Sequence, residues 1–190
     1  MAGYRKLIPS DLSSFLDHLM RLSANDRCCR FGGPTSNESI VKYGERINWT
    51  DTVIIGFYQD GGLHAAAELR VDPGSTPKAG ELAFSVEQPY QGRGIGTTLI
   101  RRILVVARNR GLRQVAVFCL AENLRMRRLL VKVNAPPVIE LPEALSVIDL
   151  PPPDTKSILQ EETDDKSGTI SVIMDYWTHD FVNSMLERVD

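Results

Sequence analysis

The residues best suited to chemistry lie in a glycine-rich stretch in mid-chain, Gln91-Gly92-Arg93-Gly94-Ile95-Gly96. Its three glycines remove β-carbons from a turn, so that backbone N–H groups can converge on a ligand. A strand pattern precedes the turn and a helical pattern follows it, which places the turn at a helix N-terminus. Because the helix dipole favours negative charge there, the turn predicts a site for a phosphate or pyrophosphate.

Three kinds of ligand suit such a turn: a nucleotide phosphate, a dinucleotide and the pyrophosphate of coenzyme A. A dinucleotide fingerprint requires a third glycine where Thr97 stands, and an acidic ribose partner about twenty residues later, where this chain is apolar. A P-loop requires Gly-Lys-Ser or Gly-Lys-Thr at the end of the turn, and the sequence has neither. Elimination therefore favours coenzyme A.

The elements that must position this turn follow from the spacing of apolar residues. Alternation predicts a strand over 81–87 before the turn, and helical periodicity predicts a helix over 96–109 after it. A buried-strand pattern follows at 114–120, and a second helix is expected over 123–133. Because a strand–helix–strand unit usually pairs its strands in parallel, we expect one parallel crossover around the turn.

The N-terminal half adds antiparallel strands and two helices. Strands are expected at 4–8, 52–59 and 63–71, the last two joined by the hairpin turn Asp60-Gly61-Gly62. One helix begins after Ser10, and the second begins at the capping-box pattern Thr35-Ser36-Asn37-Glu38. The fold class is therefore α+β, with a mixed, mostly antiparallel sheet flanked by helices.

The C-terminal segment has a looser pattern that is rich in proline. Residues 144–150 and 169–176 are expected to form strands around a mobile acidic loop at 154–168, and an amphipathic helix is expected over 178–189. The chain is treated as one domain, residues 1–190, with a core of about 4–133 and a variable part from 134 onward.

Composition excludes several classes of protein. With 43% hydrophobic and 24% charged residues the chain is typical of a globular domain, and its net charge of −2 gives no reason to expect a nucleic-acid partner. No apolar run predicts a signal peptide, a membrane span or a membrane partner, and three cysteines without a disulfide pattern favour the cytoplasm. The histidines lack metal-ligand spacing, so no metal is expected.

Charge is nevertheless uneven along the chain. Residues 93–132 are strongly basic and the stretch that follows is acidic. The basic block could attract a polyanionic cofactor, or it could form the solvated outer faces of two helices. Cys119 lies in the apolar run at 114–120 and is interpreted as a buried thiol rather than a nucleophile.

The turn resembles the Gln/Arg-x-x-Gly-x-Gly/Ala motif of the GNAT N-acetyltransferase superfamily. Phe84-Ser85-Val86 is similar to the end of the family's fourth strand, and Asn123-Leu124-Arg125-Met126 to the start of the helix after its fifth. The stretches Arg21-Leu22-Ser23 and Arg30-Phe31 are similar to the GNAT domains of some protein acetyltransferases. The resemblance covers residues 4–133. It implies transfer of an acetyl group from acetyl-CoA to a primary amine within a ternary complex, and it allows a homodimer.

The resemblance also implies a cofactor site. It implies a β-bulge near Val86 that separates the fourth and fifth strands, with pantetheine inserted between them. The expected cofactor-binding residues are Phe84, Ser85, Val86, Gln91, Gly92, Arg93, Gly94, Ile95, Gly96, Thr97 and Asn123. Asn123 fits an ordinary helix cap equally well.

Acyl transfer to an amine requires a base, a stabilised oxyanion and a proton for the leaving thiolate. Glu81 is the first candidate base, because some family members carry a catalytic glutamate at the start of this strand; a surface glutamate would fit the pattern too. Glu68 is the second candidate, and the Val86 N–H could polarise the thioester carbonyl. Many members protonate the thiolate with a tyrosine where this chain has Leu129-Leu130. That departure leaves open a non-catalytic acyl-CoA-binding or regulatory domain, and a nucleotide-binding module is a third hypothesis.

Overall fold

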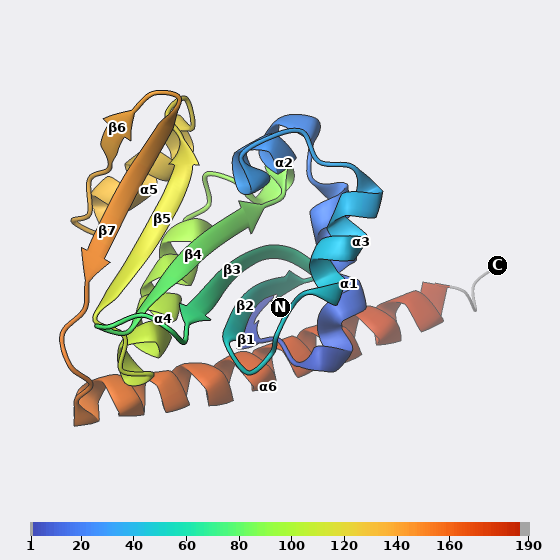
Figure 1. The fold of residues 1–190 in the computed structure, drawn as a ribbon. Helices are drawn as coiled ribbons and strands as arrows, with labels where there is room; N and C mark the ends of the chain where they lie inside the picture. Colours follow the sequence, from blue (N-terminus) through green and yellow to red (C-terminus); the bar gives the residue numbers. More distant parts are fainter. Residues whose placement is uncertain (1, 187–190) are drawn as a thin grey trace.

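The computed structural model describes residues 2–186, with side chains through residue 177. Within these residues one mixed sheet runs in the order β1-β2-β3-β4-β5-β7-β6 (Figure 1). The strands are β1 (Ala2–Lys6), β2 (Thr52–Gln59), β3 (Gly62–Asp72), β4 (Ala79–Val86), β5 (Gln114–Leu120), β6 (Val138–Glu140) and β7 (Glu143–Asp149). The pairing of β4 with β5 is parallel and the other pairings are antiparallel, which confirms the expected fold class.

Helices cover both faces of this sheet. They are α1 (Leu12–Arg21), α2 (Ala24–Phe31), α3 (Asn37–Glu45), α4 (Ile95–Asn109), α5 (Leu124–Lys132) and α6 (Thr155–Leu186). Serine side chains cap the N-termini of two of these helices: Ser23 Oγ accepts from the Asp26 N–H at α2, and Ser36 Oγ accepts from the Ser39 N–H at α3. Helix α2 and strand β6 were not expected from the sequence.

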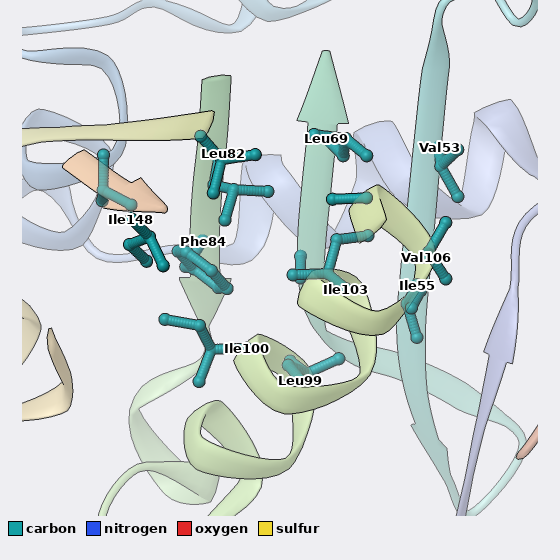
Figure 2. Close-up of a cluster of buried hydrophobic side chains, with 14 of the residues drawn as sticks. Val53, Ile55, Leu69, Leu82, Phe84, Leu99, Ile100, Ile103, Val106 and Ile148 are labelled. Atoms are coloured by element: carbon teal, nitrogen blue, oxygen red, sulfur yellow. The ribbon is translucent and has the colours of Figure 1, made fainter. Parts of the chain in front are cut away.

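The main core lies between α4 and the sheet, and it fixes the helix that follows the glycine turn. Figure 2 shows the inward face of α4 against side chains from β2, β3 and β4. The labelled residues are Val53, Ile55, Leu69, Leu82, Phe84, Leu99, Ile100, Ile103, Val106 and Ile148. All of them are less than a tenth exposed, so burial of apolar surface holds α4 against the strands.

A second apolar cluster occupies the opposite face, under α1 and α3. Phe15 and Leu19 of α1 and Ile40 of α3 meet Ile54 and Ala66 of the sheet there. This packing places one end of α1 near the C-terminal end of β4.

Strands β4 and β5 separate, as the family resemblance implies, but the expected bulge near Val86 is wrong. Their parallel pairing runs from Ala79 to Glu81 on β4. Between Ala79 and Val86 the pairing of β4 with β3 is continuous, and the irregularity between β2 and β3 lies at Phe57/Tyr58. Strand β5 pairs with β7 along its whole length, so β5 remains a regular strand where it leaves β4.

The C-terminal expectations were wrong for 154–176. The predicted acidic loop and the predicted strand at 169–176 are both parts of the long helix α6, which runs along β1 and α4 (Figure 1). Three acidic residues of 154–168 form ion pairs with other elements: Lys6 Nζ lies 2.7 Å from Asp165, Arg102 Nη2 lies 3.3 Å from Asp164, and Arg108 Nη2 lies 2.6 Å from Asp154, just before α6. The predicted final helix continues α6 to residue 186, and its predicted amphipathic side chains lie outside the described residues.

Gly168 explains part of this misreading. A β-carbon at this position would lie 1.7 Å from the carbonyl oxygen of Tyr4. Because that distance is a steric clash, α6 can pass this close to β1 only if residue 168 is glycine. In the sequence such a glycine resembles a loop residue. None of the helices in residues 2–186 combines the length and apolar character needed to cross a membrane.

Candidate functional site

A cavity of about 900 Å³ lies at the C-terminal end of β4, among the glycine turn, α2 and α5. Most of the expected cofactor-binding residues contribute to its wall. They are Phe84, Ser85, Val86, Gln91, Gly92, Gly94, Ile95, Gly96, Thr97 and Asn123. The structure therefore brings together strand, turn and helix residues that lie up to 39 positions apart in the sequence, from residue 84 to residue 123.

The glycine turn has the backbone geometry of an anion site. Gly92 and Gly94 have φ values of 74° and 83°, in the left-handed region that favours glycine. Gly94 is the N-cap of α4, and its carbonyl accepts from the Thr98 N–H at 3.0 Å. The N–H groups of Ile95, Gly96 and Thr97 precede this first helical bond and therefore have no partner within the helix. These residues line the cavity.

The exposed cations in the cavity wall come from α5 rather than from the turn. Arg128 and Lys132, one helical turn apart, line the wall and are exposed. Arg93, which was expected to bind the cofactor, instead has its guanidinium 5.4 Å from the centre of the Tyr90 ring. The basic composition of residues 93–132 indicated a cationic region, but it could not distinguish these side chains from the others.

Gln91 and Asn123 each make a local contact at the wall. Gln91 Nε2 donates to the Val86 carbonyl oxygen at 2.9 Å, so this side chain ties the turn to the end of β4. Asn123 Oδ1 accepts from the Met126 N–H at 3.1 Å and caps α5. The helix-cap interpretation of Asn123 is confirmed, and the residue lines the cavity as well.

Helix α2 closes one side of the cavity, and sequence reasoning missed it. Asp26 Oδ1 accepts from Arg125 Nη1 at 3.0 Å and from Gln91 Nε2 at 3.2 Å, which links α2, the turn and α5. The spacing of Ser23 and Asp26 is a helix-start pattern that could have revealed this element.

Glu81 faces a smaller cavity of about 200 Å³ that adjoins the larger one. The two cavities share four wall residues, Cys29, Arg30, Phe84 and Met126. Glu81 is exposed and stands where β4 and β5 begin to separate. Its carboxylate is thus available to a ligand that reaches the large cavity through the small one.

Glu68, the second candidate base, has a different setting. It is 3% exposed, and its oxygens accept from Arg30 Nη2 at 2.6 Å and Arg70 Nη2 at 3.2 Å. The Tyr43 hydroxyl donates to the same carboxylate, and burial raises the pKa of this phenol. Glu68 therefore holds α2 and α3 to β3 through ionic hydrogen bonds.

A third polar group connects α1 to the end of β4. His18 is fully buried, with Nε2 at 2.8 Å from Ser85 Oγ and Nδ1 at 2.9 Å from Glu87 Oε1. Burial lowers the pKa of His18. Although burial opposes ionisation of Glu87, hydrogen bonds from His18, His64 and Arg21 lower the pKa of this carboxyl to about 2. Sequence reasoning did not associate these residues.

Among the side chains of residues 2–177, the cysteines and histidines do not gather into a metal centre. Cys119 is buried, and burial raises the pKa of its thiol. Within the residues that the structure describes, no three His, Cys, Asp or Glu side chains gather in a way that could hold a metal ion.

Comparison with known proteins identifies a family. Residues 21–134 match the model of the Acetyltransferase (GNAT) family. Acetyltransferase Pat of Mycolicibacterium smegmatis is 28% identical over 156 residues, which cover 80% of this chain and 46% of that protein. The chain thus spans about half the length of this curated relative.

Solved structures agree on the fold. The GNAT domain of S. lividans PAT has a TM-score of 0.67 at 23% identity, covering 78% of this chain and 90% of that domain. The Salmonella typhimurium protein yncA, solved with its cofactor acetyl-CoA, has a TM-score of 0.59 at 14% identity, covering 81% of this chain and 98% of that one.

Proposed function

This chain belongs to the GNAT acetyltransferase family, and we propose that it transfers an acetyl group from acetyl-CoA to a primary amine by direct attack in a ternary complex. The acceptor is a small-molecule amine, a protein lysine or a protein N-terminus. The observation that carries the proposal is the cavity itself, whose wall joins the glycine turn to the free end of β4.

The cavity fits the parts of coenzyme A. The free N–H groups of Ile95, Gly96 and Thr97 would hold the pyrophosphate, because they combine hydrogen-bond donors with the positive end of the α4 dipole. Arg128 and Lys132 would neutralise phosphate charge. Backbone groups of β4 beyond Glu81, which β5 does not pair, would bind the pantetheine amides near Phe84 and Val86.

Glu81 is the base that we propose for the acceptor. A primary amine is protonated at neutral pH, and it must lose a proton before its nitrogen can attack the thioester carbon. Glu81 is exposed in the small cavity, where an amine that approaches Phe84 would pass it. Glu68 lacks this access, since its carboxylate is occupied by Arg30, Arg70 and Tyr43. The Val86 N–H is the proposed donor to the thioester carbonyl.

The test is thiol release from acetyl-CoA with a panel of polyamines, amino acids, aminoglycosides and lysine peptides, with mass spectrometry of the products. We expect amine-dependent release, and Glu81→Gln should lower kcat by about a hundredfold to ten-thousandfold. Glu140→Gln, an exposed glutamate on β6, is the matched control and should match the wild type.

Two results would count against this assignment. Full turnover in Glu81→Gln would exclude Glu81 as the base, and loss of turnover in a Glu68→Gln protein that circular dichroism shows to be folded would move the base to β3. Binding of acetyl-CoA without turnover on any amine would favour the non-catalytic acyl-CoA-binding alternative, which the apolar Leu129 in the cavity wall also suits.

A further inference from the structure

Ser85, His18 and Glu87 have the arrangement of a nucleophile, a general base and an orienting carboxylate. Ser85 Oγ is 2.8 Å from His18 Nε2, and His18 Nδ1 is 2.9 Å from Glu87 Oε1. Both distances lie in the range of about 2.6 to 3.2 Å expected for such a set. Ser85 and Glu87 lie near each other at the end of β4, and His18 reaches them from α1.

The direction of each hydrogen bond follows from the chemistry of the groups. An ionised carboxylate only accepts, so His18 Nδ1 must carry a hydrogen and donate it to Glu87. Because burial lowers the pKa of His18, the ring is neutral and Nε2 has a free lone pair. The Ser85 hydroxyl therefore donates to Nε2. This is the resting state in which a histidine can take a proton from serine.

The surrounding charges keep Glu87 ionised and fixed in place. Arg21 Nη2 donates to Glu87 Oε1 at 2.8 Å, and His64 Nδ1 lies 3.0 Å from Oε2. The second nitrogen of His64 lies 3.1 Å from the Gln59 carbonyl oxygen, which holds this ring as well. The carboxylate thus has one orientation, and it presents Oε1 to His18.

The position of Ser85 distinguishes this set from a purely structural network. The residue is 6% exposed, yet it lines the cavity proposed for acyl-CoA, between Phe84 and Val86. If pantetheine follows the end of β4, the thioester lies beside this strand. A serine that served only to satisfy His18 would not need to stand in the cavity wall.

We propose that Ser85 is a nucleophile for the acyl group, with His18 as its general base and Glu87 as a positioning residue, so that the protein also hydrolyses acyl-CoA through an acyl-serine intermediate. The inference rests on the proposed function in one respect: acyl-CoA must occupy the large cavity. The proposed activity is distinct from transfer to an amine, because water is the final acceptor.

The reaction balances in two steps. Ser85 Oγ attacks the thioester carbon, so a C–O bond forms and the C–S bond breaks; the hydroxyl proton passes to His18 Nε2 and then to sulfur, which leaves as the thiol. In the second step a water oxygen bonds to the acyl carbon of the ester and gives a proton to His18 Nε2. The bond between the acyl carbon and Ser85 Oγ then breaks, Ser85 Oγ takes the proton from His18, and the carboxylic acid leaves. In the first step His18 supplies the proton for the leaving thiolate. Many family members supply this proton from a tyrosine, which Leu129-Leu130 replace in this chain.

The experiment is incubation with acetyl-CoA and no amine, followed by assay of thiol release and by peptide mass spectrometry. We expect slow thiol release and an acetyl group on the peptide that carries Ser85. Ser85→Ala should lose the acetylated peptide and lower thiol release by about a hundredfold or more. Ser146→Ala is the matched control, because Ser146 is also buried in the sheet but bonds to the Ala135 carbonyl, away from the cavity wall.

Two further variants test the base and the positioning residue. His18→Asn keeps a donor toward Glu87 and removes the proton acceptor, so acetylation of Ser85 should stop. Glu87→Gln should lower kcat for hydrolysis and change the pH profile of kcat, because the amide no longer fixes the tautomer of His18. A smaller folded fraction alone would lower kcat by the same factor at every pH at which the variant is equally folded.

Calorimetric titration of acetyl-CoA accompanies each assay and separates the two proposals. If wild-type protein binds acetyl-CoA in the absence of amine but neither releases thiol nor acquires an acetyl group on Ser85, the inference is wrong, whereas the proposed transfer to an amine is unaffected. Hydrolysis by Ser85→Ala at the wild-type rate would overturn it equally. If acetyl-CoA does not bind at all, the proposed function itself fails.

Discussion

The large cavity and the polar cluster of Glu68, Arg30, Arg70 and Tyr43 beneath α2 and α3 use charged groups in opposite ways. In the cluster, Glu68 and Arg30 are buried and bond to each other at 2.6 Å. At the cavity, Arg128 and Lys132 have no ion pair with any side chain that the structure describes, and the first N–H groups of α4 have no helical partner. The difference teaches that residue type alone does not assign a role. A charged group that is paired within the protein holds elements together, whereas a charged group without a partner in the protein is available to a ligand.

The sharpest test of this comparison is the stability of two glutamate variants. Glu68→Gln leaves the Arg30 guanidinium buried without its counter-charge, which should cost about 3 to 5 kcal/mol of unfolding free energy. Glu81→Gln, on the same face of the sheet but exposed, should stay within about 0.5 kcal/mol of the wild type. Chemical denaturation measures both values. Equal losses of unfolding free energy in the two variants would contradict the distinction between a buried, paired glutamate and an exposed one.

Acid should lower the unfolding free energy through the hydrogen-bond network of Glu87 with His18, Arg21 and His64. The pKa of this carboxyl is lowered from 4.5 to about 2, so its contribution is fully present above pH 4.5 and is lost as the pH falls toward 2. The shift corresponds to about 3 kcal/mol. His18, whose pKa is lowered from 6.5, adds a loss that begins below that value, because the unfolded chain takes up the proton more readily.

Denaturation curves between pH 7 and pH 3 measure this loss. In Glu87→Gln the part of the loss that lies below pH 4.5 should be smaller, while Glu81→Gln should keep the wild-type profile. An identical acid profile in Glu87→Gln would contradict the contribution assigned to this network.

Substitution of an unpaired cation in the cavity wall should produce the smallest of these effects, a loss of affinity for CoA. Arg128→Ala should weaken CoA binding by about 1 to 3 kcal/mol, the range for a hydrogen bond to a charged group. The loss should shrink as salt screens the phosphates. Arg101→Ala, an exposed arginine on α4 that is not part of the cavity wall, is the control. A loss as large in Arg101→Ala would indicate a general effect of net charge instead.

The sequence predicted the parts of the site that depend on local pattern. The glycine turn, helix α4, the parallel crossover and most of the cavity wall follow from spacing within residues 81–133, where each element lies next to its neighbour in the chain. Helix α2 was missed although Ser23 and Asp26 mark its start, because its short stretch lacks a buried apolar face.

The remaining features depend on contacts between distant residues. His18 and Ser85 are 67 positions apart, and nothing near either residue in the sequence indicates the other. The expectation of a mobile loop and a strand in 154–176 failed for the same reason: the acidic side chains and Gly168 acquire their meaning from Lys6, Arg102, Arg108 and Tyr4, which lie on other elements.

The central claim is that the glycine turn holds acyl-CoA in the cavity, and titration of acetyl-CoA into wild type and Gly94→Val tests it most directly. Gly94 has a φ of 83° in the cavity wall, and a β-branched side chain strains that backbone and displaces the N–H groups at the start of α4. We predict binding to the wild type and a loss of at least about a hundredfold in affinity in the variant, with circular dichroism unchanged. Equal affinity for acetyl-CoA in both proteins would contradict the claim.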